Sequence, residues 1–191
     1  MFPGAQKMSL EERIDGAPNY RGLLISTIRS LNTPRSSRKE CDGPRIYGIG
    51  MPTMEAIRSV MIKTGIEKSH DRKLLWTSLR EEPVVYVNGR PYVLRLFANP
   101  MKNLEATGII RERVEAMEER MKLDIINELR YYDGRVLLHD EEGDISNFTI
   151  IPIWETVSED DVMTPLDVYK VIQKEGYNID YLRIPMYHYL T

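Results

Sequence analysis

The chain has 191 residues, of which 42% are hydrophobic and 29% charged, so it is long enough for one domain with a hydrophobic core. Its formal net charge of -3 leaves no basic excess for a broad nucleic-acid surface, and we expect no nucleic acid partner. No apolar run reaches the roughly 20 residues of a transmembrane helix, and the N-terminal residues lack the apolar stretch of a secretory signal. We therefore expect a cytoplasmic protein without a membrane span.

The first 44 residues differ from the rest of the chain. They mix serines with arginines and show little apolar periodicity, which predicts a loop-rich or disordered segment over residues 1–44 and one domain over residues 45–191. The single cysteine, Cys41, lies in this segment and excludes an internal disulfide and a cysteine-based metal cluster. We expect no metal and no cofactor.

From Arg45 onward, strand and helix patterns alternate. A short strand runs from Arg45 toward Gly50, and Pro52 with Thr53 suits the start of a helix that Gly65 ends. Residues 73–79 have the compact apolar pattern of a buried strand. Asn88-Gly89, flanked by apolar residues, predicts a tight β-hairpin because both positions of this turn need positive φ.

The second half of the chain continues the alternation. Thr107 opens the longest predicted helix, which ends at Gly134 and whose acidic side, including Glu118, we expect to be solvated. Strands are predicted over 135–139 and 147–154, separated by an acidic turn at 140–144. Thr164 and Asp167 form a capping box with Pro165 at the first helical position, Gly176 ends that helix, and 177–185 is a last strand. The order favours an α/β sandwich with a mainly parallel sheet flanked by helices.

The motifs of several hydrolytic mechanisms are missing from these 191 residues. A cysteine phosphatase needs a thiolate at a helix N-terminus and an arginine six positions later, but Tyr47 stands six positions after Cys41. We therefore interpret Cys41 as a surface or loop thiol. Gly48 and Gly50 are only part of a dinucleotide fingerprint and fit a strand-to-helix turn better, and the three histidines share no ligand spacing.

Two charged groups follow predicted strands, where α/β proteins place functional side chains. Arg80, Glu81 and Glu82 either contact a ligand or form a charged turn whose Arg-Glu pair holds the hairpin, and the residues alone leave both readings open. His139, beside Asp140, is at the predicted end of the strand 135–139. It is either a functional side chain or an ordinary surface residue.

Several phrases occur in a familiar order, namely RIYGIGMPTMEAIRSV, WTSLREEPVVYVNGRPYVLR and TPLDVYKVIQKEGYNIDYLRIP. They resemble the paladin family, in the phytase-like branch of the protein tyrosine phosphatase superfamily, and GAPNYR resembles the opening phrase of a paladin repeat. The resemblance implies a phytase-type phosphatase sandwich and an inositol phosphate or phosphoprotein as partner. It also implies phosphate-binding roles for Arg80 and, with less support, for His139 and Asp140.

The resemblance stops after Pro185. Family members continue with a stretch that holds the general acid and then with a Cys-x5-Arg loop, whereas this sequence reads MYHYLT. The expectation is therefore an incomplete, truncated member of the family without catalysis of its own. The alternative is a non-catalytic phosphate-binding or scaffold module. A sheet that lacks its central strand would also have an exposed edge through which the chain could self-associate.

Overall fold

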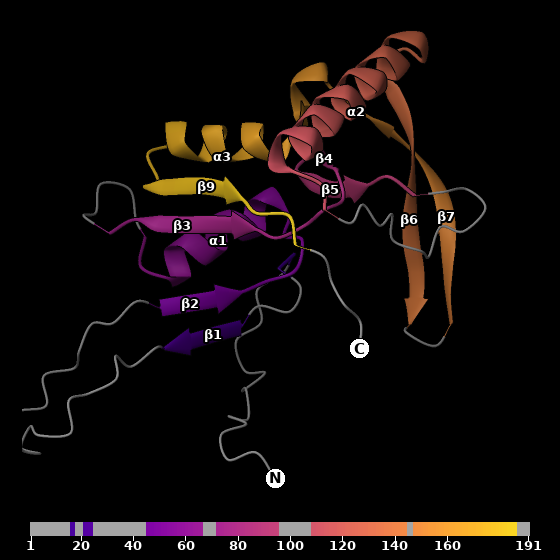
Figure 1. Ribbon diagram of the computed structural model, residues 1–191. Coiled ribbons are helices and arrows are strands. Elements are labelled where there is room, and N and C mark those ends of the chain that lie inside the picture. The colour runs from indigo at the N-terminus through magenta and orange to yellow at the C-terminus, as the bar shows by residue number, and fades with distance from the viewer. Residues whose placement is uncertain are drawn as a thin grey trace, which may run out of the picture. The chain divides into compact units, whose positions relative to one another are not determined.

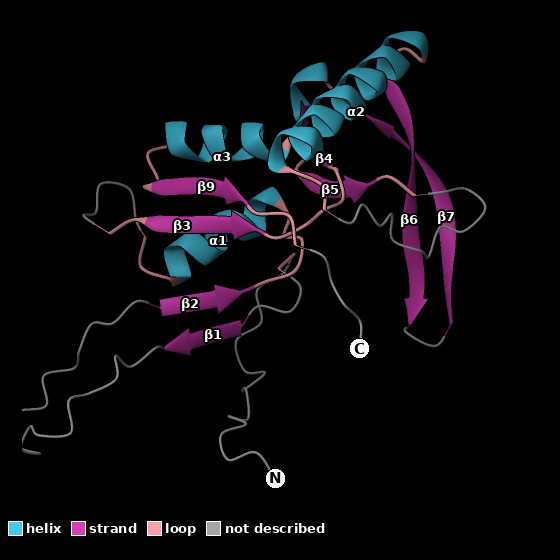
Figure 2. Cartoon of the chain, in the orientation of Figure 1, coloured by secondary structure: helices cyan, strands magenta, loops and turns pink. Residues whose placement is uncertain are grey.

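The computed structural model describes residues 16–17, 21–24, 45–66, 72–95, 108–144 and 147–186. The chain divides into two compact units, residues 1–59 and 60–191. Figure 2 distinguishes the helices from the strands. The proposed boundary between residues 44 and 45 remains a prediction.

The first unit contains an antiparallel strand pair. Strand β1, Arg21–Leu24, pairs with β2, Arg45–Gly48. Strand β1 lies in the segment that the sequence predicts to be loop or disorder, so for these four residues the prediction is wrong. Cys41 and most of residues 1–44 lie outside the described residues.

Gly16 of the GAPNYR phrase lies against the start of the first helix. Its carbonyl oxygen accepts a hydrogen bond from the Thr53 amide at 2.9 Å, and the Thr53 hydroxyl accepts one from the Ala56 amide at 3.1 Å. Gly16 has φ +71°, and a Cβ atom at this position would lie 2.5 Å from Thr53 Oγ1. Glycine is thus required here both for the backbone conformation and for space.

Helix α1, Met54–Lys63, confirms the helix predicted after Pro52 and Thr53. The side chains of its predicted apolar face are buried, with Ile57 and Met61 fully so. Gly65 ends the helix with φ +74°, as its sequence position predicts.

The second unit contains a parallel pair of strands. Strand β3, Leu74–Ser78, pairs with β9, Ile179–Arg183, and the two run side by side in Figure 1. Tyr169 stacks on Tyr181 at 4.5 Å between ring centroids and lies 5.4 Å from Trp76, so aromatic packing covers one face of this pair. The prediction of a buried β3 is wrong in detail, because alternate residues such as Leu75 are exposed.

The second unit also contains a three-stranded antiparallel sheet. Strand β4, Val84–Val87, pairs with β5, Arg90–Val93, and with the short strand β8, Val162–Met163. Asn88 and Gly89 have φ values of 48° and 73°, which confirms the predicted tight hairpin. The α/β class is therefore confirmed, while parallel pairing within the described ranges joins only β3 and β9.

Helix α2 spans Arg111–Tyr131 and begins later than predicted. Thr107 is outside the described residues. The expected glycine follows the end of the helix: Gly134 has φ +78° and donates its amide hydrogen to the Leu129 carbonyl at 2.7 Å. Its buried face contributes Leu129 to a core cluster whose other buried members are Val85, Val87, Val136, Leu138, Val157 and Val162.

Strands β6, Arg135–Asp144, and β7, Asn147–Thr156, form a long antiparallel ribbon. The acidic turn predicted at 140–144 is wrong, because these residues continue β6 and pair with β7 as far as Asp144 with Asn147. The apolar run of β7 gives the acidic residues a partner strand that local composition does not reveal.

A 3-10 helix, η2, spans Glu159–Asp161 and precedes helix α3, Pro165–Lys174. The capping box is present as predicted, with Asp167 N donating to Thr164 Oγ1 at 3.2 Å and Thr164 N donating to Asp167 Oδ2 at 3.1 Å. Lys122 Nζ also lies 2.7 Å from Asp167 Oδ2, which ties α2 to α3. Among the helices that the structure describes, none combines the length and apolar character needed to cross a bilayer.

Candidate phosphate-binding site

The candidate site lies where the parallel strands β3 and β9 end. Because both strands run in the same direction, their carboxyl ends meet at one edge of the pair. Arg183 is the last residue of β9, and Arg80 follows β3 by two residues. The fold therefore brings together two arginines that are separated by about half of the chain.

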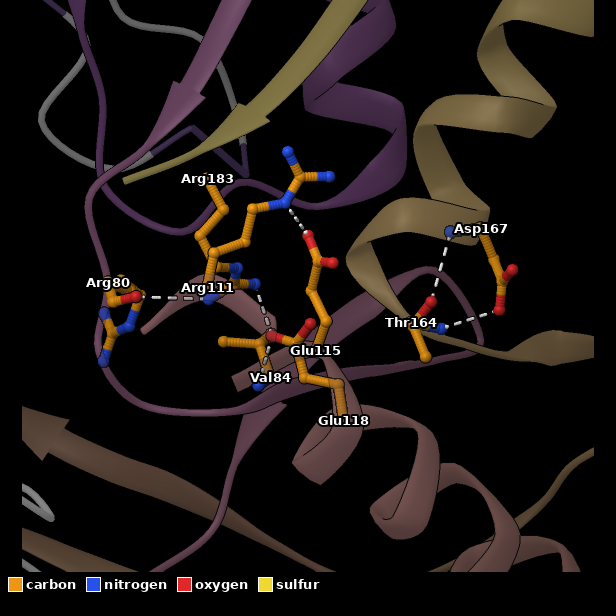
Figure 3. Close-up of polar contacts among 8 residues, drawn as sticks. All are labelled: Arg80, Val84, Arg111, Glu115, Glu118, Thr164, Asp167 and Arg183. Carbon is orange, nitrogen blue, oxygen red and sulfur yellow. Dashed lines mark hydrogen bonds and ion pairs between the residues drawn. The ribbon is translucent and has the colours of Figure 1, made fainter. Parts of the chain in front are cut away.

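Arg183 is held by a buried ion pair with Glu118 of α2 (Figure 3). Arg183 Nη2 donates to Glu118 Oε1, which also accepts the Val84 amide at 3.1 Å, and the two residues are only 2% and 1% exposed. Burial raises the pKa of Glu118 to about 7, although Arg183 and the Val84 amide oppose this change. The prediction that Glu118 belongs to a solvated helix face is therefore wrong.

Arg183 also fixes the backbone at Arg80. Its Nη1 donates to the Arg80 carbonyl oxygen at 3.2 Å, as Figure 3 shows. The strand pairing continues past the strand ends, since Ile184 N donates to Ser78 O at 2.8 Å and Met186 N donates to Leu79 O at 3.0 Å. The segment that carries Arg80 is thus anchored to β9 and, through Glu118, to α2.

The Arg80 side chain shares a carboxylate with a second arginine. Arg80 Nη2 pairs with Glu82 Oε2, and Arg95 Nη1 lies 2.7 Å from Glu82 Oε1. The side chain of Glu82 is 8% exposed, whereas those of Arg80 and Arg95 are 33% and 27% exposed. The Arg-Glu pair expected in a charged turn is therefore present, and both arginine side chains remain partly exposed.

Two arginine donors at this edge remain unused. The Nε atoms of Arg80 and Arg183 are buried and have no hydrogen-bond partner among the described residues. An unpaired buried donor costs free energy, of the order of 1–3 kcal/mol, unless a further group accepts its hydrogen. An oxyanion is the kind of group that satisfies several arginine donors at once.

His139 and Asp140 lie on the β6–β7 ribbon, and Arg80 follows a strand of a different sheet. Both side chains are exposed, and Arg90 Nη1 lies 3.8 Å from Asp140 Oδ2. The expectation that His139 ends its strand is wrong, because β6 continues to Asp144 and His139 pairs with Pro152. No contact shown among the described residues joins either side chain to Arg80.

Sequence reasoning missed three members of the site, namely Arg95, Glu118 and Arg183. Arg95 follows β5 by two residues, as Arg80 follows β3, and this shared position was the available signal. Glu118 and Arg183 pair with each other although they are 65 residues apart in the sequence, and no local pattern indicates this pairing. Among the side chains described, no three His, Cys, Asp or Glu residues converge to hold a metal ion.

Comparisons with known proteins agree with the phrases noted in the sequence. Human paladin is 30% identical over 100 residues, covering 51% of this chain and 10% of paladin. Chicken paladin is 27% identical over 113 residues, covering 58% of this chain and 12% of that protein. The chain therefore matches about a tenth of the length of these relatives, and no solved structure matches it.

The family model for PTP-like phytases, described by the words inositol hexakisphosphate, matches residues 77–189, which is more than half of the chain. The matched region contains Arg80, Glu82, Arg95, Glu118 and Arg183. The resemblance to paladin and to phytase-type phosphatases is thereby confirmed. The chain belongs to the PTP-like phytase family.

Proposed function

We propose that this chain binds phosphoryl groups of an inositol phosphate at the carboxyl ends of β3 and β9, with Arg80 as the main contact. The observation that carries the proposal is the partly exposed Arg80 side chain, whose buried Nε donor has no hydrogen-bond partner among the described residues. Its backbone is anchored by Arg183. Family membership supports a phosphorylated ligand, and a phosphoprotein would present the same chemical group.

We infer that binding is not followed by hydrolysis in this chain. Its single cysteine, Cys41, has Tyr47 where the phosphate-cradling arginine of a Cys-x5-Arg loop would stand. Such a loop supplies the nucleophile and the amides that stabilise the transition state. The matched paladins are about ten times longer than the aligned region, so the chain fits the role of one part of a phosphatase domain.

Calorimetry with inositol hexakisphosphate tests the binding proposal. The wild-type chain should bind, and Arg80→Ala should weaken binding about tenfold or more, because charge-assisted hydrogen bonds to phosphate contribute about 1.5–3 kcal/mol. Arg113→Ala is the matched control, since it removes an exposed arginine of α2. Equal heats for Arg80→Ala and Arg113→Ala, or no heat for wild type, would refute the proposal.

The same samples test the absence of hydrolysis. We expect no inorganic phosphate above the background of a heat-denatured control. His139 and Asp140 remain predictions from the resemblance. If they share the ligand with Arg80, His139→Ala should also weaken binding; an unchanged affinity would remove them from the site.

A further inference from the structure

Glu82 lies between the two guanidinium groups that face the candidate site. One of its carboxylate oxygens pairs with Arg80 and the other accepts from Arg95 at 2.7 Å. The carboxylate is nearly buried, while both arginine side chains are partly exposed. An anion that approaches Arg80 and Arg95 from solvent therefore meets cations that already have an internal partner.

A phosphoryl group offers the same kind of bridge with more charge. Its oxygens can accept from both guanidinium groups, as the two oxygens of Glu82 do, and a phosphate monoester carries about -1.5 to -2 at pH 7 against -1 for a carboxylate. Coulombic attraction to the two cations grows with that charge. A dianion can therefore compete with Glu82, whereas a monoanion gains little by doing so.

We propose that Glu82 is an internal competitor that an anion must displace from Arg80 and Arg95, so that a phosphoryl dianion binds and a more weakly attracted monoanionic group does not. This inference rests on the proposed function, in which Arg80 contacts the ligand. It adds that the ligand replaces Glu82 as the partner of Arg80 and Arg95, so these residues determine how strongly charged a bound anion must be. The buried Arg80 Nε, which Glu82 does not engage in the structure, leaves a donor for the incoming group.

The test compares two six-fold anions on rings, inositol hexakisphosphate and benzenehexacarboxylate, with three forms of the chain. These are wild type, Glu82→Gln and the matched control Glu81→Gln, which removes the same charge one position earlier from a side chain with no described ion pair. Wild type should prefer the phosphate ligand. In Glu82→Gln both ligands should bind about tenfold more tightly, because the competing charge is gone. Glu81→Gln should change either affinity less than about threefold, because the ion pairs of Arg80 and Arg95 at this site are with Glu82.

The outcomes separate the two proposals. If wild type, Glu82→Gln and Glu81→Gln all fail to bind inositol hexakisphosphate, the proposed function fails and this inference fails with it. If wild type binds through Arg80 but Glu82→Gln has the same affinities as Glu81→Gln, only the competitor role is overturned.

A second variant keeps the test valid if Glu82→Gln does not fold. Glu82→Asp keeps the charge but is one methylene shorter, so it cannot bridge Arg80 and Arg95 equally, and we expect a change in the same direction. NMR of the wild-type chain gives an independent reading: inositol hexakisphosphate should shift the Arg80 Nε–H signal. An unshifted signal at saturating ligand would contradict the inference.

Discussion

Arg183, the last residue of β9, and Glu118, in the middle of α2, form an ion pair that is almost completely buried. The pair joins the end of the parallel strands to the longest helix, and a second bond from Arg183 holds the backbone at Arg80. The candidate phosphate contact is therefore positioned by a polar network in the core, rather than by a loop at the surface.

Breaking this pair should destabilise the protein strongly. Glu118→Met or Arg183→Met alone leaves a buried charge without its partner, and we expect the free energy of unfolding to fall by about 3 kcal/mol or more in each case. The double variant should lose much less than the sum, because neither charge remains. Urea denaturation measures all three changes.

The exposed neighbour Glu119 provides the control for these variants. Glu119→Ala should change the free energy of unfolding by less than about 0.5 kcal/mol. Additive losses in the double variant would show that Glu118 and Arg183 do not interact.

The stability of the chain should depend on the titration of Glu118. The folded-state pKa of about 7 is above the unfolded value of about 4.3 for glutamate, so the folded state binds this proton more tightly. The resulting stabilisation is fully present below pH of about 4 and is lost as the pH rises through about 7.

We therefore expect the unfolding free energy of wild type, relative to Glu118→Gln, to fall by about 3 kcal/mol between pH of about 4 and 8. Denaturation at several pH values measures this difference. A difference that rises with pH would mean that Arg183 lowers the pKa of Glu118 more than burial raises it.

The capping box of α3 should contribute about 1 kcal/mol to stability. Thr164→Ala removes the hydroxyl that accepts the Asp167 amide hydrogen, and loss of such a cap costs about 0.5–2 kcal/mol. Ser158→Ala is the matched control, because Ser158 precedes η2 without a side-chain cap bond. Equal denaturation midpoints for the two variants would contradict the expected contribution of the cap.

Gly16→Ala should disrupt the contact between the GAPNYR phrase and α1. The added methyl group would lie too close to Thr53 Oγ1, and alanine at φ +71° costs about 1–2 kcal/mol. Amide hydrogen exchange should therefore become faster at Thr53, whose N–H donates to Gly16. Unchanged exchange at Thr53 would argue against this contact in solution.

The self-association expected from the sequence can be tested at the exposed apolar side chains along and just beyond β3 and β9. They are Leu75, Leu79, Ile184 and Met186, with Leu75 59% exposed. We expect the sedimentation coefficient to rise with protein concentration and this rise to be smaller for Leu75→Ser. A monomer at all concentrations would exclude self-association through this surface.

Features set by neighbouring residues were predictable from the sequence. The Asn88-Gly89 turn, the Thr164 capping box and the glycine at the end of each helix depend on a few adjacent positions, and the structure has them as predicted. The family resemblance also indicates Arg80 as a phosphate contact, which remains a prediction.

Features that depend on distant partners were not predictable. Strand β1 needs β2, which lies about twenty residues later, and the acidic half of β6 is a strand because β7 pairs with it. In the sequence, Glu118 has the same pattern as the solvated charges of its helix, and only the folded chain places it beside Arg183. The pairing of Arg95 with Glu82 follows from the β4–β5 hairpin, which reverses the chain between them.

A crystal structure of the chain with inositol hexakisphosphate tests the phosphate-binding role of this edge most directly. A phosphoryl group should lie within hydrogen-bond distance of the Arg80 guanidinium, between Arg80 and Arg95, with Glu82 displaced from at least one of them. Ligand bound elsewhere, with the pairs of Glu82 intact and Arg80 without contact to it, would contradict the assignment.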